Sequence, residues 1–138
     1  MNFIGIGAEE IPTLAGQLIP LIEKPLQKMD AAKYFTAEHV IEKCLSRDWQ
    51  CWVAGQGRID AIFITYIDMY PTGYKTLTIF LIGGEKMPQW FDMGWDILKR
   101  FGQAHGCKEI IGLGRKGWIR ALKDKGEINE RLNFAVKI

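Results

Sequence analysis

Apolar residues repeat every three to four positions in several stretches of the chain, and this spacing predicts amphipathic helices. We expect helices at residues 9–29, 36–45 and 88–106, with a shorter helix at 116–126. Pro20 should kink or end the first helix, and Pro25 should mark its limit. Thr36 should cap the second helix, and the third should begin at Pro88.

In other stretches the apolar residues alternate with polar ones or form short unbroken runs, which predicts strands. Two strands within residues 51–68 should be joined by a turn at Gly55–Gly57, and further strands are expected at 74–82, 107–113 and 131–138. The run from Ala61 to Ile67 is apolar at almost every position, which is typical of a strand covered on both faces.

The predicted order is therefore α-α-β-β-β-α-β-α-β, in a single domain over residues 1–138. Hairpins come early in this order and helical crossovers come late. We therefore expect an α/β (α+β) fold with a mixed, mainly antiparallel central sheet flanked by helices.

Composition narrows the functions that the chain can have. With 18 basic and 16 acidic residues the net charge is +2, too small to favour nucleic acid or a membrane surface as a partner. The three cysteines form no C-x-x-C pair, which argues against a disulfide framework and favours a reducing compartment. Neither His39 nor His105 has a partner at metal-ligand spacing. The first residues lack a secretory pattern, so we expect a cytoplasmic protein without a metal ion.

Residues 109–127, EIIGLGRKGWIRALKDKGE, contain the dinucleotide-binding spelling G-x-G-x-x-G at Gly112, Gly114 and Gly117. A dinucleotide fold has this motif in its first strand-to-helix turn, and an acidic residue follows about 20 residues later within a full β-α-β unit. Here only 21 residues follow Gly117, and the main helical crossover precedes the motif. We interpret the three glycines as backbone positions of a strand-to-helix turn.

The element order, together with the stretch GRKGWIRALKDKGE, resembles the GNAT superfamily of acyl-CoA N-acyltransferases. More closely, the chain looks like the small GNAT-like proteins of tailed bacteriophages, including podophage internal virion proteins. The resemblance covers nearly the whole chain as architecture, but as a motif it is confined to residues 107–127. It implies a location in the bacterial host cytoplasm and, for the phage type, in the virion.

GNAT enzymes hold the pyrophosphate of acyl-CoA at the helix N-terminus after the fourth strand, where free amides and the helix dipole attract phosphate. The corresponding turn of this chain is residues 82–90, IGGEKMPQW. If acyl-CoA binds, the resemblance implies cofactor contacts from four residues: Gly83, Gly84, Lys86 and Arg115.

Two features of this turn count against acyl-CoA. Glu85 brings a negative charge close to the phosphates, and Pro88 lacks an amide donor. The spaced glycines that the family has at this place are also absent. The resemblance therefore leaves a phosphate site and a simple strand-to-helix turn as alternatives.

The family's general acid is a tyrosine in the pattern N-x-x-A-x-x-x-Y-x-x-x-G, which protonates the departing CoA thiolate. Counting back from Gly126 puts Leu122 at the tyrosine, Trp118 at the alanine and Arg115 at the asparagine. Leucine has no proton to give, and tryptophan is far larger than alanine. Both differences argue against acyl transfer by the usual route.

An enzyme would also need a base for the attacking amine. The candidates in the strand region are Asp60, Asp68 and Glu85, with Tyr66 as a proton relay. Each carboxylate has a structural alternative, because Asp60 and Asp68 lie at the ends of a predicted strand, where solvated caps are common.

The long helix at 88–106 carries Trp90, Phe91, Met93 and Trp95, more large side chains than one buried stripe holds. Aromatic residues are enriched at the centres of interfaces, so we expect a protein partner, either phage structural proteins or a second copy of the chain. The basic residues around the last helix are interpreted as a solvated face.

Two functions follow from these observations. The first is a GNAT-fold phage protein that has lost its acyl-CoA machinery and acts through protein contacts in virion assembly, with no cofactor. The second is an acetyl-CoA-dependent N-acetyltransferase acting on an unknown amine. Leu122 and the turn at residues 82–90 favour the first of these predictions.

Overall fold

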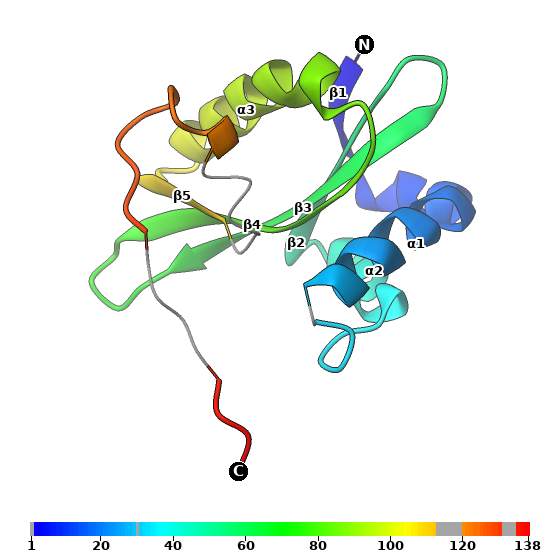
Figure 1. Cartoon of the computed structure of the whole chain (residues 1–138), viewed down its shortest axis with the longest axis horizontal. Coiled ribbons are helices and arrows are strands. Elements are labelled where there is room, and N and C mark those ends of the chain that lie inside the picture. Colours follow the sequence, from blue (N-terminus) through cyan, green and yellow to red (C-terminus); the bar gives the residue numbers. More distant parts are fainter. Residues whose placement is uncertain (1, 30, 113–119, 131–134) are drawn as a thin grey trace.

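A computed structural model of the chain describes residues 2–29, 31–112, 120–130 and 135–138. Its elements are β1 (Asn2–Ile6), the short 3₁₀ helix η1 (Ala8–Glu10), α1 (Ile11–Lys28), α2 (Ala37–Leu45), β2 (Trp49–Gly55), β3 (Ile59–Met69), β4 (Lys75–Gly84), α3 (Met87–Ala104) and β5 (Glu109–Gly112). Helices α1 and α2 cover one face of the sheet and α3 covers the other (Figure 1). The predicted α/β (α+β) architecture is confirmed.

The five strands lie in the order β1-β2-β3-β4-β5. Neighbouring strands are antiparallel from β1 to β4, whereas β4 and β5 are parallel and are connected through α3. The predicted mixed, mainly antiparallel sheet is therefore correct. The hairpin between β2 and β3 turns at residues 56–58, within one residue of the predicted turn.

Strand β1 is an element that the hydrophobic pattern does not predict. It pairs with β2 from Asn2 opposite Gly55 to Ile6 opposite Cys51. Phe3 is the one buried residue of this strand, so its five residues show no alternation of buried and exposed positions from which a strand could be predicted. With β1 counted, Lys75–Gly84 is the fourth strand of the chain and Glu109–Gly112 is the fifth.

Only part of each of the two predicted C-terminal elements falls on described residues. Arg120 and Ala121 are helical, but residues 122–126 form turns, and Gly126 has a φ of +151° that a helix does not accept. Residues 135–138 belong to no strand, and Val136 is exposed. The remainder of both predictions, including Arg115 and Trp118, lies outside the described residues.

Helix α1 continues through both of its prolines, so Pro20 does not end it, and the prediction that Pro25 marks its limit is wrong. Its apolar stripe explains why: Ile11, Leu18 and Ile22 are buried against the sheet, and packing outweighs the loss of two backbone hydrogen bonds. Pro25 has no N–H for the carbonyl of Leu21, four residues earlier. That carbonyl faces the sheet at the end of β4.

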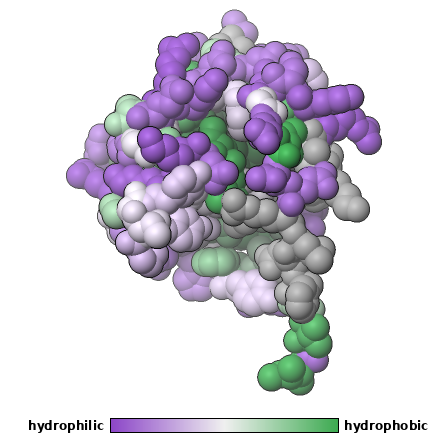
Figure 2. Space-filling view, turned by 90° about the vertical axis from the view of Figure 1, so that its left-hand side faces the viewer, coloured by the Kyte–Doolittle hydropathy of each residue, from purple (hydrophilic) through white to green (hydrophobic). Residues whose placement is uncertain are grey.

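The two faces of the sheet carry separate cores. The α1/α2 side holds Val53, Ile62 and Ile64 of the strands, and the α3 side holds Trp52, Phe63 and their neighbours. The molecular face in Figure 2 is largely hydrophilic, with hydrophobic side chains gathered in a central hollow. Of the helices that the structure describes, none is both long and apolar enough to cross a membrane.

Candidate functional site

Strand β4 contains a β-bulge in the middle of the sheet. Ile64 of β3 pairs with Leu81, while the next residue, Thr65, pairs with Ile79, so Phe80 is an extra residue on β4. The bulge turns both Phe80 and Leu81 toward the α1/α2 core. Bulges break the regular ladder and are frequent next to active sites, where they redirect side chains and backbone groups.

Among the described residues, the parallel pairing of β4 with β5 runs from Thr76 opposite Glu109 to Ile79 opposite Gly112, just before the bulge. Strand β4 continues to Gly84 and then turns into α3. The bulge at Phe80 and the end of β4 at Gly84 are thus four residues apart, about 13 Å at 3.3 Å per residue, and α3 begins at Met87.

The loop from β4 to α3 is held by three hydrogen bonds. The Glu85 amide donates to the Asp60 carbonyl at 3.0 Å, the Gln89 amide donates to the Lys86 carbonyl at 2.9 Å, and the Trp90 indole N–H donates to the Glu85 carbonyl at 2.8 Å. These bonds commit two of the loop amides, and Pro88 provides none. Lys86, the N-cap of α3, is left-handed with a φ of 62°.

Asp60 is the side chain that organises this loop. It is only 4% exposed, and its Oδ1 accepts a hydrogen bond from Nε of Arg58 at 2.9 Å. Nζ of Lys86 lies 3.6 Å from the same oxygen. A carboxylate so buried needs partners of this kind to stay charged. Asp60 therefore acts as an anchor of the loop, and its burial contradicts the alternative of a solvated strand cap. A role for Asp60 as a catalytic base stays a prediction.

Gly83 and Gly84 let the backbone pack closely at this point. A Cβ on Gly83 would lie 2.2 Å from the Leu21 carbonyl oxygen, the one that Pro25 leaves without its helical donor. A Cβ on Gly84 would lie 2.2 Å from the Asp60 carbonyl oxygen. The two glycines thus allow a close backbone approach toward α1 and β3. Whether acyl-CoA also uses these glycines stays a prediction.

The other predicted acid–base residues lie at the opposite end of β3. Tyr66 pairs with Thr78 and Asp68 with Thr76, so all four side chains share the α1/α2 face of the sheet. The Thr78 hydroxyl donates to Oδ2 of Asp68 at 3.4 Å. Asp60 and Glu85 lie more than five residues away along the strand, and the structure does not bring the two groups together.

Burial raises the pKa of Tyr66, and the nearby negative charge of Asp68 raises it further. Tyr66 therefore keeps its proton at neutral pH. Its ring stacks on Trp49 with centroids 5.2 Å apart, and Trp49 also contacts Phe80 at 4.8 Å. Trp49 thus connects the bulge to Tyr66. Sequence reasoning missed this aromatic contact because Trp49 lies just outside the predicted strand.

The raised pKa of Tyr66 predicts a loss of stability in alkali. Tyrosine in the unfolded chain ionises near pH 10, whereas Tyr66 in the folded chain resists ionisation, so rising pH lowers the free energy of the unfolded chain relative to the folded one. The stabilisation is complete below pH 10 and is lost as pH rises toward the folded pKa. Tyr66→Phe should flatten this decline in urea titrations between about pH 8 and 11. Tyr34→Phe, an exposed control, should leave it unchanged; equal slopes for both variants would contradict the assignment.

Thr76 presents a polar atom that lacks a partner. Its side chain is 1% exposed, and its Oγ1 is buried without a hydrogen bond to any described residue. Leaving such a group unsatisfied costs about 1–3 kcal/mol. Thr76 pairs with Asp68 on one side and with Glu109 on the other, so the three residues form one row across β3, β4 and β5. We call Asp68, Thr76 and Glu109 the polar row.

Leu122 and the tryptophans of α3 belong to the core on the α3 side. Leu122 is half-buried in that cluster. Trp90 is fully buried, with its ring edge-on to Phe63, while Trp95 is half-buried and tilted on Phe91. The stripe therefore accommodates Trp90 and Phe91 completely and leaves Trp95 partly accessible.

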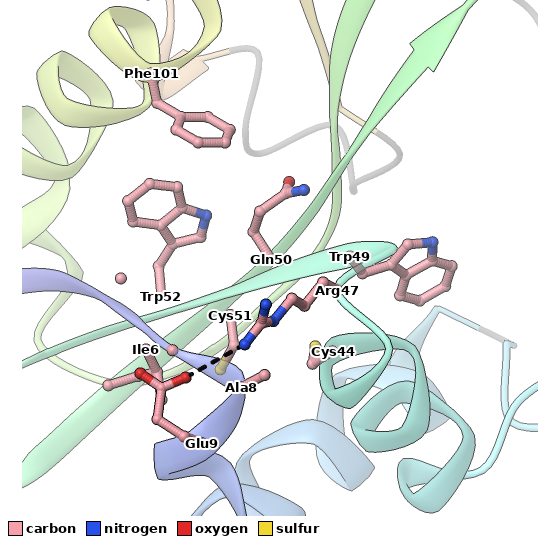
Figure 3. Close-up of a pocket in the computed structure, with 12 residues that line it drawn as sticks. Ile6, Ala8, Glu9, Cys44, Arg47, Trp49, Gln50, Cys51, Trp52 and Phe101 are labelled. Carbon is pink, nitrogen blue, oxygen red and sulfur yellow. Dashed lines mark ion pairs between the residues drawn. The ribbon is translucent and has the colours of Figure 1, made fainter. Parts of the chain in front are cut away.

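The surface has two hollows, of about 410 and 430 Å³, and Trp49 lines the first of them. The first opens where β2 extends past the end of β1, and an ion pair of 3.9 Å between Arg47 and Glu9 crosses it (Figure 3). Cys44 and Cys51 line it as free thiols. Their mutual hydrogen bond lowers the pKa of Cys44 and, with burial, raises that of Cys51.

Within the described part of the chain, no three His, Cys, Asp or Glu side chains are grouped to hold a metal ion.

No family model matches this sequence, and a search of curated proteins finds no match. Solved structures match it over its whole length. A ribosomal-protein-alanine N-acetyltransferase from Brucella melitensis biovar Abortus 2308 has a TM-score of 0.73 at 11% identity, with 100% of both chains covered. An aminoglycoside acetyltransferase from an uncultured soil metagenomic sample has a TM-score of 0.73 at 14% identity, covering 99% of this chain and 97% of that one. The fold is that of the GNAT acetyltransferases.

A third GNAT-like structure adds a ligand to the comparison. It is a predicted acetyltransferase from Clostridium acetobutylicum with acetyl-CoA, with a TM-score of 0.69 at 13% identity over 99% of this chain and 95% of that one. In the GNAT-like fold of the present chain, the unpredicted β1 makes β4 the fourth strand. The loop at Lys86 therefore is the turn after the fourth strand, as the resemblance required.

Proposed function

We propose that this GNAT-fold protein is an acyl-CoA-dependent N-acyltransferase, with acetyl-CoA as the acyl donor and an amine as the acceptor. The observation that carries the proposal is the arrangement along β4. A bulge interrupts the ladder at Phe80, and four residues later β4 ends at Gly84, in a glycine turn that leads to α3 with Lys86 as its N-cap. A helix N-terminus and a lysine together attract a phosphate group. The bulge lies on the strand that leads to this helix.

The residues of the loop fit a phosphate group in part. Lys86 would supply positive charge, and its left-handed backbone turns the chain at the start of the helix dipole. Lys86 forms an ion pair with Asp60, and Arg58 forms a second one with the same carboxylate. The Lys86 side chain can therefore move to bind a phosphate while Asp60 keeps Arg58 as its partner.

The chemistry requires two proton movements. The amine nitrogen attacks the thioester carbonyl carbon, a C–N bond forms, the C–S bond breaks, and CoA leaves as a thiolate. The nitrogen must lose a proton, which Asp68 can accept through the Thr78 hydroxyl that bonds it. The thiolate must gain one. Since Leu122 cannot give it, we assign this role to Tyr66, whose raised pKa keeps it protonated.

A second candidate function, from a different class, is favoured by the same loop. Two loop amides already have backbone acceptors, Pro88 provides no amide, and Leu122 packs in the core where the family places its acid. A chain that lacked acyl-CoA chemistry would act through protein contacts, in virion assembly or by self-association. The exposed Met69 and Tyr70 at the tip of the β3–β4 hairpin suit such contacts.

Titration calorimetry with acetyl-CoA separates the two functions. We expect saturable 1:1 binding, and release of free CoA thiol when an amine is added. Lys86→Ala should weaken binding about tenfold or more, because a hydrogen bond to a charged group contributes about 1.5–3 kcal/mol. Lys24→Ala, an exposed lysine on α1, should not change the affinity. Absence of binding by the unchanged chain would refute the enzyme and leave the protein-contact function.

A further inference from the structure

The first surface hollow, of about 410 Å³, opens where β1 ends and β2 continues (Figure 3). Ile6 is the last residue of β1 that pairs with β2, and it lies opposite Cys51. Trp49 and Gln50 of β2 therefore extend beyond β1, and both line the hollow. Pockets for small molecules have volumes of about 300–1,000 Å³ and combine apolar walls with a few polar groups. This hollow has both properties, and we call it the Arg47 hollow.

Arg47 extends over the hollow from a backbone position that favours glycine. It follows Ser46, the C-cap of α2, and its φ is 68°. Its amide donates to the Cys44 carbonyl at 3.2 Å, which closes the end of the helix. Glycine takes this left-handed position without steric cost, whereas an L side chain is disfavoured there. The fold alone therefore gives no advantage to an arginine at this position.

The ion pair between Arg47 and Glu9 also contributes little to the fold. The two side chains are 77% and 71% exposed, and the guanidinium nitrogen lies 3.9 Å from the carboxylate oxygen. This distance is too long for a hydrogen bond, and exposed ion pairs add almost nothing to stability. Arg47 and Glu9 thus place a positive and a negative group side by side at the hollow, and both groups keep their capacity to bond a ligand.

A chain of hydrogen bonds orients the side chain of Gln50. The indole N–H of Trp52, which can only donate, donates to the Thr65 hydroxyl at 2.9 Å. The hydroxyl in turn donates its single proton to Oε1 of Gln50 at 2.9 Å. This order places the carbonyl of the Gln50 amide toward Thr65 and leaves its NH₂ group to donate elsewhere. Since Gln50 lines the hollow, this group adds two donors to those of Arg47.

Another part of the hollow is aromatic. Trp52 and Phe101 both line it, and their rings meet edge to face with centroids 5.0 Å apart (Figure 3). Trp49 and Ile6 add further apolar surface. Aromatic rings bind an additional apolar or aromatic group through contacts of this kind. The complementary ligand therefore carries a carboxylate, an ammonium group and an apolar side chain.

We propose that the Arg47 hollow binds a free α-amino acid with an apolar side chain. The carboxylate binds Arg47 and the NH₂ group of Gln50, and the ammonium group binds Glu9. The side chain packs on Trp52 and Phe101. The nitrogen and the carboxylate carbon of an α-amino acid are two bonds apart, about 2.5 Å, so one ligand can contact both members of the ion pair. Inside a peptide chain neither charge is present, which excludes an internal peptide segment as the ligand.

This inference does not rest on the proposed function. The hollow lies at the edge of β2 and the bulge lies on β4, so two strand spacings, about 10 Å, separate them. Trp49 stands between the two places, because it lines the hollow and its ring contacts Phe80. The amino acid is therefore a ligand separate from the amine that the proposed reaction acylates, and its binding needs no acyl-CoA.

Calorimetry with L-phenylalanine, without acyl-CoA, tests the site directly, and we expect saturable 1:1 binding. N-acetyl-L-phenylalanine lacks the ammonium group and L-phenylalanine amide lacks the carboxylate, so each should bind about tenfold more weakly or worse. Glycine cannot contact the aromatic wall and should also bind about tenfold more weakly or worse. Absence of L-phenylalanine binding, or equal binding of all four compounds, would overturn the proposal.

Arg47→Gly separates the ligand site from the fold. Because glycine suits the left-handed backbone, the melting temperature should stay unchanged or rise. Affinity for L-phenylalanine should nevertheless fall about tenfold or more, and the variant should no longer distinguish L-phenylalanine from its amide. Gln50→Glu keeps an acceptor for Thr65 but replaces the NH₂ group by a negative oxygen, so it should weaken L-phenylalanine binding as well. Arg100→Ala, at an exposed position of α3, is the matched control and should bind like the unchanged chain.

The remaining outcomes of this experiment are equally decisive. Unchanged L-phenylalanine affinity in Arg47→Gly would overturn the site, and equal weakening in Arg100→Ala would show general charge attraction in its place. If Arg47→Gly lowers both the melting temperature and the affinity, the comparison with L-phenylalanine amide decides between ligand and fold. Partial unfolding weakens both compounds equally, which would contradict the proposal, whereas loss of the carboxylate contact weakens only L-phenylalanine.

Discussion

Gly84→Ala will lower the free energy of unfolding by about 3 kcal/mol and abolish measurable binding of acetyl-CoA. Gly84 has a φ of +113°, which L side chains rarely adopt, and its Cβ would lie 2.2 Å from the Asp60 carbonyl oxygen and 2.5 Å from the Ala61 Cα. Both obstacles are backbone atoms that cannot rotate away. The loop must therefore move, and the Glu85 amide moves with it. Urea titration gives the stability change.

Gly57→Ala is the matched control for that result. Gly57 also has a positive φ, +77°, but a Cβ there meets nothing within 4 Å. We expect a loss of about 1 kcal/mol from the backbone conformation alone, with unchanged acetyl-CoA binding. If Gly57→Ala destabilised the chain as much as Gly84→Ala, close packing of β4 against β3 would not be the cause.

Trp90→Ala will cost about 3–5 kcal/mol, the range for deleting a large buried aromatic side chain. Trp90 is 1% exposed, packs edge-on to Phe63 and donates its indole N–H to the Glu85 carbonyl. Its loss leaves a cavity between α3 and the sheet. Thermal and urea unfolding measure the change, and a loss below about 1 kcal/mol would contradict this packing.

Trp90→Phe separates the two roles of this side chain. Phenylalanine keeps most of the ring contact but cannot donate to the Glu85 carbonyl, so we expect a smaller loss of about 1–3 kcal/mol. Acetyl-CoA affinity should fall with it, because the carbonyl no longer fixes the loop before Lys86. Unchanged affinity in a destabilised Trp90→Phe variant would show that the indole bond stabilises only the fold.

The sequence allowed most of the architecture to be predicted, because apolar spacing reports local structure directly. The hydrophobic pattern of β3 and β4 depends on residues close together in the sequence. The same is true of the cap of α2, where the His39 amide donates to the Thr36 hydroxyl at 3.2 Å. Prediction was wrong or silent where tertiary contacts decide. Pro20 lies within a continuous α1 because the helix packs on the sheet, and β1 exists because β2 provides its pairing partner.

In the candidate site too, some features depend on residues close in the sequence and others depend on tertiary contacts. The glycines and Lys86 of the β4–α3 turn could be identified by spacing, but the role of Asp60 depends on burial and on Lys86, a residue 26 positions away. The polar row depends on register across three strands, and no local pattern relates Asp68, Thr76 and Glu109. Glu85 and Asp68 were both candidate bases by residue type; only their positions on the sheet separate them.

The contact between Gly83 and the Leu21 carbonyl has an evolutionary consequence. Pro25 frees that carbonyl from its helical bond, and the absence of a Cβ at position 83 lets β4 approach it. A side chain at position 83 would push α1 away from the sheet, and a donor residue at position 25 would close the helix ladder again. Related proteins should therefore keep or change the two positions together. This covariation would identify descendants of the fold even where the residues of the site have diverged.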